Sequence, residues 1–250
     1  MFINEILRFR TFRQKQRRLL TKLSNTFLDM KIRRLRKTKK VYQPAFLPEL
    51  NWNYEMSPSK EISLALQISQ ITSRIGERES TIDIGSNLGY ITLNLGRQFP
   101  NSVVWGLEPD KDLVEAANRS AEKASLKNVK FQELEVNNLN IEAIPDFDNT
   151  IFLSVFQQWV RAYGLSQSQQ MLKTIIRKTK KKFFFSMATT NGSPKIREYF
   201  PDMGQTLEES DKWIVDNLFT GSDYNIDILG RFETTYGSSL PRTLFLLTKK

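Results

Sequence analysis

The stretch that decides the fold is S-T-I-D-I-G-S-N-L-G-Y-I-T-L-N-L-G, residues 80–96. Its first five residues are typical of a buried strand, Gly85 and Gly89 allow the backbone to approach a ligand, and the last residues return to helical spacing. One strand later, V-V-W-G-L-E-P-D places an acid, Glu108, at the strand's end. A strand, a glycine turn, a helix and a second strand ending in an acid together predict a nucleotide site in an α/β sheet.

The turn favours one kind of nucleotide. It has neither the glycine spacing of a dinucleotide-binding loop nor the lysine of a phosphate-binding loop, so a diphosphate ligand is not expected. A nucleoside with a charged tail fits better, because Asp83 can hold an ammonium group and Glu108 can accept from both ribose hydroxyls. The sequence therefore predicts S-adenosylmethionine as the cofactor, and a side chain added at Gly85 is expected to collide with it.

This order of parts resembles class I methyltransferases, with D-I-G-S-N-L-G in the place of their first motif and G-L-E-P in the place of their second. The resemblance implies an α/β, Rossmann-like fold: a mostly parallel seven-stranded sheet with an antiparallel terminal strand and helices on both faces. The alternation of strand-like and helix-like segments after residue 80 favours the same architecture. The alternative is an ordinary strand, turn and helix in some other α/β protein.

The class I pattern also implies which residues hold the cofactor. The first turn would hold its amino-acid end, Glu108 its ribose, and Glu135 its adenine amino group, although the sequence around Glu135 also reads as a solvated loop. Ser154 follows the fourth strand, at the edge where open α/β sheets bind ligands. The predicted cofactor-binding residues are Asp83, Gly85, Ser86, Asn87, Gly89, Glu108, Pro109, Asp110, Glu135 and Ser154.

Three stretches narrow the resemblance: D-I-G-S-N-L-G-Y-I-T-L, L-S-V-F-Q-Q-W-V and R-T-L-F-L-L-T-K. They are similar to the RNA methylphosphate capping enzymes, the bicoid-interacting protein family, and to bacterial methyltransferases of surface-polysaccharide clusters. The similarity covers most of residues 78–250. Gln157 and Gln158 stand where the polysaccharide-type sequences often carry histidines, and Thr243 stands where the capping family has proline. The acceptor is left open between a surface-glycan-related or small-molecule substrate and RNA.

The chain has no histidine and no cysteine, which limits the chemistry of methyl transfer. A general base would have to be a carboxylate, a lysine or a tyrosine, whereas a phosphate or carboxylate acceptor needs no base at neutral pH. An oxyanion acceptor is therefore favoured over a hydroxyl, and no metal is predicted. The substrate-side candidates are Gln157, Gln158, Trp159, Arg161 and Arg242. The alternatives are a core position for Trp159 and surface salt bridges for the arginines.

The positive charge of the chain is concentrated at its N-terminus. Residues 1–40 hold 14 of the 37 Lys and Arg residues and two of the 27 acids, which leaves 23 basic and 25 acidic residues beyond them. Apolar residues recur there at helical spacing, so we predict a basic amphipathic arm over 1–40, an aromatic and proline-rich linker over 41–59, and the methyltransferase domain over 60–250.

The arm has three interpretations: binding to an anionic membrane surface, binding to nucleic acid, or packing on the domain. The chain contains no apolar run of about 18 residues, so we expect a cytoplasmic protein, peripheral at the inner membrane surface if the arm binds lipid. A non-enzymatic alternative is a methyltransferase-like module that binds a partner through the arm.

Overall fold

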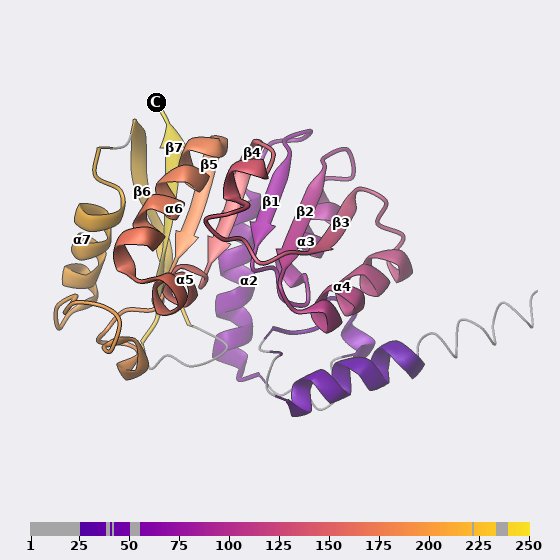
Figure 1. The fold of residues 1–250 in the computed structure, drawn as a ribbon. Coiled ribbons are helices and arrows are strands. Elements are labelled where there is room, and N and C mark those ends of the chain that lie inside the picture. Colours follow the sequence, from indigo (N-terminus) through magenta and orange to yellow (C-terminus); the bar gives the residue numbers. More distant parts are fainter. Residues whose placement is uncertain (1–25, 39–40, 42, 51–55, 222, 234–239) are drawn as a thin grey trace, which may run out of the picture. The chain divides into compact units, whose positions relative to one another are not determined.

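A computed structural model describes residues 26–38, 41, 43–50, 56–221, 223–233 and 240–250. The chain divides into two compact units, Met1–Tyr42 and Gln43–Lys250. The described part of the first unit contains a helix over 26–37, and the apolar positions predicted for the arm before residue 26 lie outside the described residues. The second unit contains a seven-stranded sheet with helices packed on it (Figure 1).

The sheet has the strand order β3-β2-β1-β4-β5-β7-β6. Strands β1 to β5 are parallel, and β7 is antiparallel to both of its neighbours. The chain builds the sheet outward from β1 to β3 and then returns to add β4 on the other side of β1. This reversal creates a switch point between β1 and β4, where open α/β sheets bind ligands. The strands are β1 Thr81–Ile84, β2 Val104–Glu108, β3 Val129–Glu133, β4 Phe147–Leu153, β5 Thr179–Ser186, β6 Tyr224–Phe232 and β7 Arg242–Lys249.

The helices follow the alternating pattern that the sequence predicts, with one addition. The addition is α5, which starts directly after β4 and is separated from α6 by Gly164. Asp110 caps α4 by accepting hydrogen bonds from the backbone N–H groups of Asp112 and Leu113. The helices are α2 Pro58–Thr72, α3 Tyr90–Gln98, α4 Lys111–Lys123, α5 Phe156–Tyr163, α6 Leu165–Lys178 and α7 Leu207–Leu218, with short 3-10 helices η1 Pro48–Leu50, η2 Ile141–Ala143 and η3 Pro194–Ile196.

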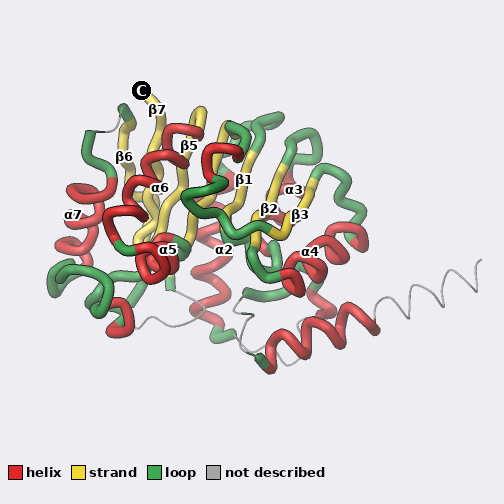
Figure 2. The backbone as a smooth tube through the Cα atoms, in the orientation of Figure 1, coloured by secondary structure: helices red, strands yellow, loops and turns green. Residues whose placement is uncertain are grey.

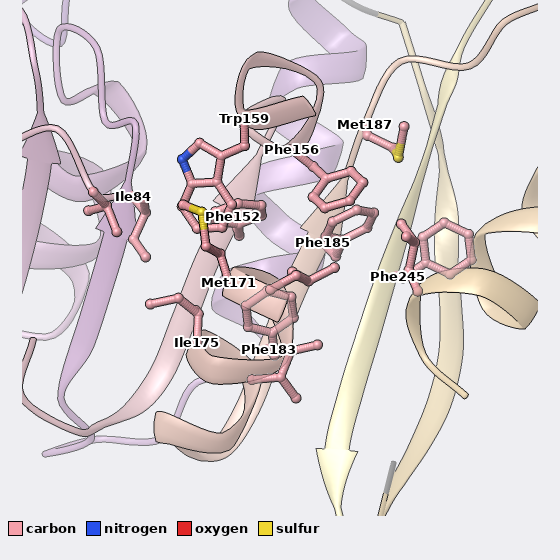
Figure 3. Packing of buried hydrophobic residues seen from close by; sticks show 14 of the residues in the cluster. Ile84, Phe152, Phe156, Trp159, Met171, Ile175, Phe183, Phe185, Met187 and Phe245 are labelled. Atoms are coloured by element: carbon pink, nitrogen blue, oxygen red, sulfur yellow. The ribbon is translucent and has the colours of Figure 1, made fainter. Parts of the chain in front are cut away.

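Both faces of the sheet are buried. The evidence is that neighbouring residues of one strand, which point to opposite faces, belong to different hydrophobic clusters. On β5, Phe183 and Phe185 pack in a cluster that includes residues of α5, α6 and α7, whereas Phe184 packs in a cluster with residues of α2 and α3. In Figure 2, α6 and α2 accordingly lie on opposite sides of the strands. Figure 3 shows part of the first cluster, including Phe152, Phe183 and Phe185. These observations confirm the predicted fold, with helices on both faces of a mixed sheet.

Part of the predicted linker packs on the domain. Phe46 is buried among residues that include Leu93, Val114 and Phe131, and the guanidinium carbon of Arg97 lies 4.8 Å from the centre of its ring. Residues 51–55, which include two of the linker aromatics, lie outside the described residues. The boundary between the two compact units falls after residue 42, so the described linker residues 43–50 belong to the second unit rather than acting only as a spacer.

Candidate cofactor and acceptor site

The turn between β1 and α3 is fixed to the end of β2 by backbone hydrogen bonds. The N–H groups of Gly85 and Ser86 donate to the carbonyl oxygen of Leu107 at 2.8 and 3.0 Å. Gly85, Asn87 and Gly89 adopt positive φ angles of 78°, 52° and 75°. Glycine and asparagine tolerate this region best, which is why the D-I-G-S-N-L-G sequence can form so tight a turn.

The space that a glycine leaves open in this turn is filled by protein side chains. A Cβ atom added to Gly85 would lie 2.6 Å from Cγ2 of Val155, and one added to Gly89 would lie 2.3 Å from the Phe131 ring. A Cβ atom on Gly106 of β2 would also meet the Phe131 ring, at 2.5 Å. The sequence predicted that a side chain at Gly85 would collide with the cofactor, whereas in the structure it would collide with Val155. Gly106 and Phe131 were not predicted as part of the site, although a glycine inside a buried strand is a signal of close approach.

Glu108 is the last residue of β2, and its carboxylate is buried against the turn. Oε2 accepts from the backbone N–H of Asn87 at 2.9 Å, and Oε1 accepts from the backbone N–H of Asp110 at 3.1 Å. Burial raises the pKa of this carboxyl above its ordinary value, and the two hydrogen bonds oppose that rise. Each carboxylate oxygen can accept about two hydrogen bonds, so each keeps capacity for one more. That remaining capacity matches the two neighbouring hydroxyls of a ribose.

Asp83 lies inside β1 and is only 4% exposed. Its Oδ2 accepts a hydrogen bond of 2.6 Å from the hydroxyl of Thr92 on α3, a partner that was not predicted. Burial raises the pKa of the Asp83 carboxyl to about 7, the Thr92 hydroxyl opposes the rise, and the nearby Glu108 adds to it. A cation bound close to this carboxyl would be stabilised by its ionised form.

We expect Asp83 to contribute a loss of stability to the unliganded protein as the pH rises from about 4 to about 7. An Asp in the unfolded chain ionises near 3.8, whereas Asp83 in the fold ionises near 7, so the folded state binds more protons between these values. The stabilisation is complete below the lower pKa and lost as the pH rises through the upper one. In melting temperatures measured from pH 4 to 8, the wild-type value minus that of Asp83→Asn should therefore fall as the pH rises. The exposed control Asp216→Asn should keep the wild-type slope, and equal slopes for all three proteins would contradict the assignment.

At the end of β4 the structure brings together Ser154 and Arg242, two residues predicted for opposite sides of the site. Ser154 has a φ of 63°, and its backbone N–H donates to the carbonyl oxygen of Ser186 at 2.7 Å. Its hydroxyl accepts a short hydrogen bond from Nη1 of Arg242, the first residue of β7. The two side chains thus meet near the carboxyl ends of β4 and β5.

The two glutamines after β4 differ in their surroundings. Gln157, in the first turn of α5, is 8% exposed, and its Oε1 has no hydrogen-bond partner among the described residues. Gln158 is exposed. A buried amide oxygen without a partner is costly, so Gln157 is the glutamine better placed to accept a hydrogen bond from a ligand.

The remaining predicted residues lie outside this cluster. Trp159 is buried in the core, with its ring centroid 4.8 Å from that of Phe152 (Figure 3). Arg161 is exposed on α5, and Pro109 is exposed before α4. Glu135 is exposed and accepts a hydrogen bond of 2.8 Å from the Tyr163 hydroxyl. Within the described residues, no three acidic side chains gather closely enough to hold a metal ion.

A sheet in this strand order, with a glycine turn after β1 and an acid at the end of β2, defines a class I methyltransferase. The chain belongs to the methyltransferase domain family, whose model matches residues 75–225. The chain therefore contains an S-adenosylmethionine-dependent methyltransferase domain, as the sequence predicted. No curated protein sequence matches the chain significantly.

Two solved structures illustrate the likeness in fold. The bifunctional kinase-methyltransferase WbdD is 18% identical, with a TM-score of 0.62, and the match covers 80% of this chain and 42% of WbdD. The chain thus spans less than half the length of that protein. The magnesium protoporphyrin IX methyltransferase ChlM from Synechocystis PCC 6803, solved with bound SAM, is 12% identical, with a TM-score of 0.53 and coverage of 78% of this chain and 86% of ChlM. At these identities the likeness concerns the fold alone.

Proposed function

We propose that the turn after β1 and the end of β2 hold S-adenosylmethionine at the switch point of the sheet. The observation that carries this proposal is the buried Glu108 carboxylate, which has one accepting position left on each oxygen. Asp83 would face the ammonium group directly or through water, and the backbone of Ser86 and Asn87 would line the amino-acid end. Bound there, the cofactor supplies a methyl group activated by its sulfonium. The protein's own contribution is alignment of the acceptor with that group.

The acceptor group we propose is an oxyanion, a phosphate or carboxylate of a surface-glycan-related or small-molecule substrate. The chain contains no histidine. Tyr163 is unsuited to act as a base, because burial and its hydrogen bond to Glu135 raise the pKa of its hydroxyl. Arg242, held beside Ser154, can instead position an anion through charge-assisted hydrogen bonds. The resemblance to surface-polysaccharide methyltransferases supports a glycan-related substrate.

Mass spectrometry of a cell extract incubated with labelled S-adenosylmethionine and this protein would identify the methylated product. With that acceptor, Arg242→Gln should lower kcat/KM by about 10- to 150-fold, the scale of one hydrogen bond to a charged group. Cofactor affinity should stay within about twofold of the wild type. An equal loss of cofactor affinity would mean that Arg242 supports the fold or the cofactor rather than the acceptor.

A second proposal concerns the N-terminal arm, which we infer to be a reversible anchor on anionic membranes. Its described helix, over 26–37, carries five basic residues, and Asp29 is its only acid. Phe27 and Met30, about one turn apart, are 52% and 62% exposed. Exposed apolar side chains among basic residues are typical of helices that lie on anionic lipid surfaces. None of the helices in the described ranges is both long and apolar enough to cross a bilayer.

The intact protein should therefore co-sediment with anionic vesicles, ignore neutral ones, and dissociate at high salt as the charges are screened. Deleting residues 1–40 should abolish sedimentation and leave the melting temperature and cofactor affinity close to their wild-type values. Equal sedimentation of both proteins, or loss of folding in the shorter one, would show that the arm is mainly a packing element. Steep, salt-dependent binding to RNA that requires the arm would favour the RNA methyltransferase alternative.

A further inference from the structure

A polar pocket of about 330 Å³ lies in the loop between β5 and α7. This loop begins at the carboxyl end of β5, the edge of the sheet that also carries Ser154. None of the residues that line the pocket was predicted as a site residue. Its walls include Thr190, Asn191, Arg197, Phe200, Asp202 and Gln205.

Thr190 fixes the shape of the pocket, because two other parts of the loop donate hydrogen bonds to it. Nε of Arg197 donates to its carbonyl oxygen at 2.9 Å, and the backbone N–H of Met203 donates to its hydroxyl at 3.1 Å. Thr190 itself is 3% exposed. The Arg197 side chain is thus held through Nε, which leaves its two terminal nitrogens as donors. In the described part of the chain, Arg197 forms no ion pair with a carboxylate.

The other polar side chains of the pocket are also partly engaged, in a way that defines what they can still bind. Oδ1 of Asn191 accepts a hydrogen bond of 2.5 Å from the Thr189 hydroxyl, and its Nδ2 is buried without a partner among the described residues. Oδ1 of Asp202 accepts from the N–H of Gly204 at 3.0 Å, which leaves the second carboxylate oxygen available. The pocket therefore offers the two terminal guanidinium nitrogens of Arg197 and the amide nitrogen of Asn191 as donors, and a carboxylate oxygen of Asp202 as an acceptor.

The position of the pocket connects it to the proposed acceptor site. Phe200 forms one wall, and its ring centroid lies 6.1 Å from that of Phe156. Phe156 begins α5 and directly precedes Gln157, the buried glutamine described above. A ligand in the pocket would lie beside the helix that starts at the end of β4.

We propose that this pocket anchors the acceptor through a polyhydroxylated group that carries an oxyanion, with Arg197 paired to the oxyanion and Asp202 accepting from a hydroxyl. The inference rests on the proposed function and extends it by naming the class of acceptor: a sugar phosphate or a sugar carboxylate. The guanidinium group of Arg197 can donate two parallel hydrogen bonds to a phosphate or to a carboxylate. The Asp202 carboxylate would repel an anion that has no hydroxyl group to donate to it. A volume at the small end of ligand pockets suits one sugar unit rather than a chain.

Calorimetric titration of the full-length protein with glucose 6-phosphate, glucuronate and uncharged glucose tests the proposal. At least one of the anionic sugars should bind 10-fold or more tightly than glucose, and the tighter one identifies the anion. Arg197→Gln should weaken that binding at least 10-fold. The matched control Lys195→Gln removes the same charge from the neighbouring 3-10 helix, outside the pocket lining, and should change the binding less than twofold. Asn191→Asp places a negative charge in the pocket and should also abolish binding of the anion.

Anionic sugars that bind no better than glucose would overturn the proposal, and so would anion binding that Arg197→Gln leaves within about twofold of the wild type. Cofactor affinity, measured on the same samples, should be equal in all four proteins. Failure of the wild-type protein to bind S-adenosylmethionine would contradict the proposed function. Normal cofactor binding without selective binding of anionic sugars would contradict only the pocket assignment.

Discussion

Glu108→Ala should weaken S-adenosylmethionine binding about 30- to 150-fold, which corresponds to roughly 2–3 kcal/mol. The substitution removes the acceptor of both proposed ribose hydrogen bonds. It also frees the backbone N–H groups of Asn87 and Asp110, which hold the turn in its binding conformation. Isothermal titration calorimetry measures the change directly.

Glu133→Ala is the matched control for this experiment. Glu133 ends β3 in register with Glu108 on the neighbouring strand, but it is exposed rather than buried. Its removal should leave cofactor affinity within about twofold of the wild type. An unchanged dissociation constant for Glu108→Ala, or an equal loss in both variants, would exclude Glu108 as the ribose ligand.

Gly85→Ala should destabilise the protein by about 2–5 kcal/mol and abolish cofactor binding at ambient temperature. The left-handed backbone costs an alanine about 1–2 kcal/mol, and the collision with Val155 adds about 1–3 kcal/mol for an overpacked contact. Any rearrangement that relieves the collision would move the turn that holds the cofactor. Chemical denaturation measures the stability, and calorimetry measures the binding.

Two further variants separate the cost of the left-handed backbone at Gly85 from the cost of the collision with Val155. Gly221 also has a positive φ, of 70°, but a Cβ atom there meets nothing within 4 Å, so Gly221→Ala should cost only the backbone term and leave binding intact. The double variant Gly85→Ala with Val155→Ala removes the colliding methyl group and should recover part of the lost stability. If Gly85→Ala were no more destabilising than Gly221→Ala, Val155 would not be packed against the turn as the structure has it.

The sequence predicted the fold because the information for each element is local. A buried strand, its glycine turn and the following helix are written in one continuous stretch, and the acid at the end of β2 lies only one strand further on. The antiparallel end of the sheet was expected from the resemblance to class I methyltransferases. The missed helix α5 is short and runs almost directly into α6, so its periodicity merges with that of the longer helix.

The contacts that shape the site could not be predicted in the same way, because they join segments far apart in the chain. Phe131 fills the space opened by Gly89 and Gly106, and Arg242 reaches Ser154 across 88 positions of sequence. Thr190 and Arg197 lie in an irregular loop, where no hydrophobic periodicity predicts how the side chains are placed. For such residues the sequence limits the chemistry, whereas the packing of the fold decides which side chains meet.

A crystal structure of the protein with S-adenosylhomocysteine tests the central claim most directly. We predict that the two ribose hydroxyl oxygens lie at hydrogen-bond distance, about 2.5–3.0 Å, from the two carboxylate oxygens of Glu108. The amino-acid end should lie along the backbone of Gly85 to Asn87, near Asp83. A nucleoside bound elsewhere on the sheet edge, or one whose ribose makes no contact with Glu108, would contradict the account.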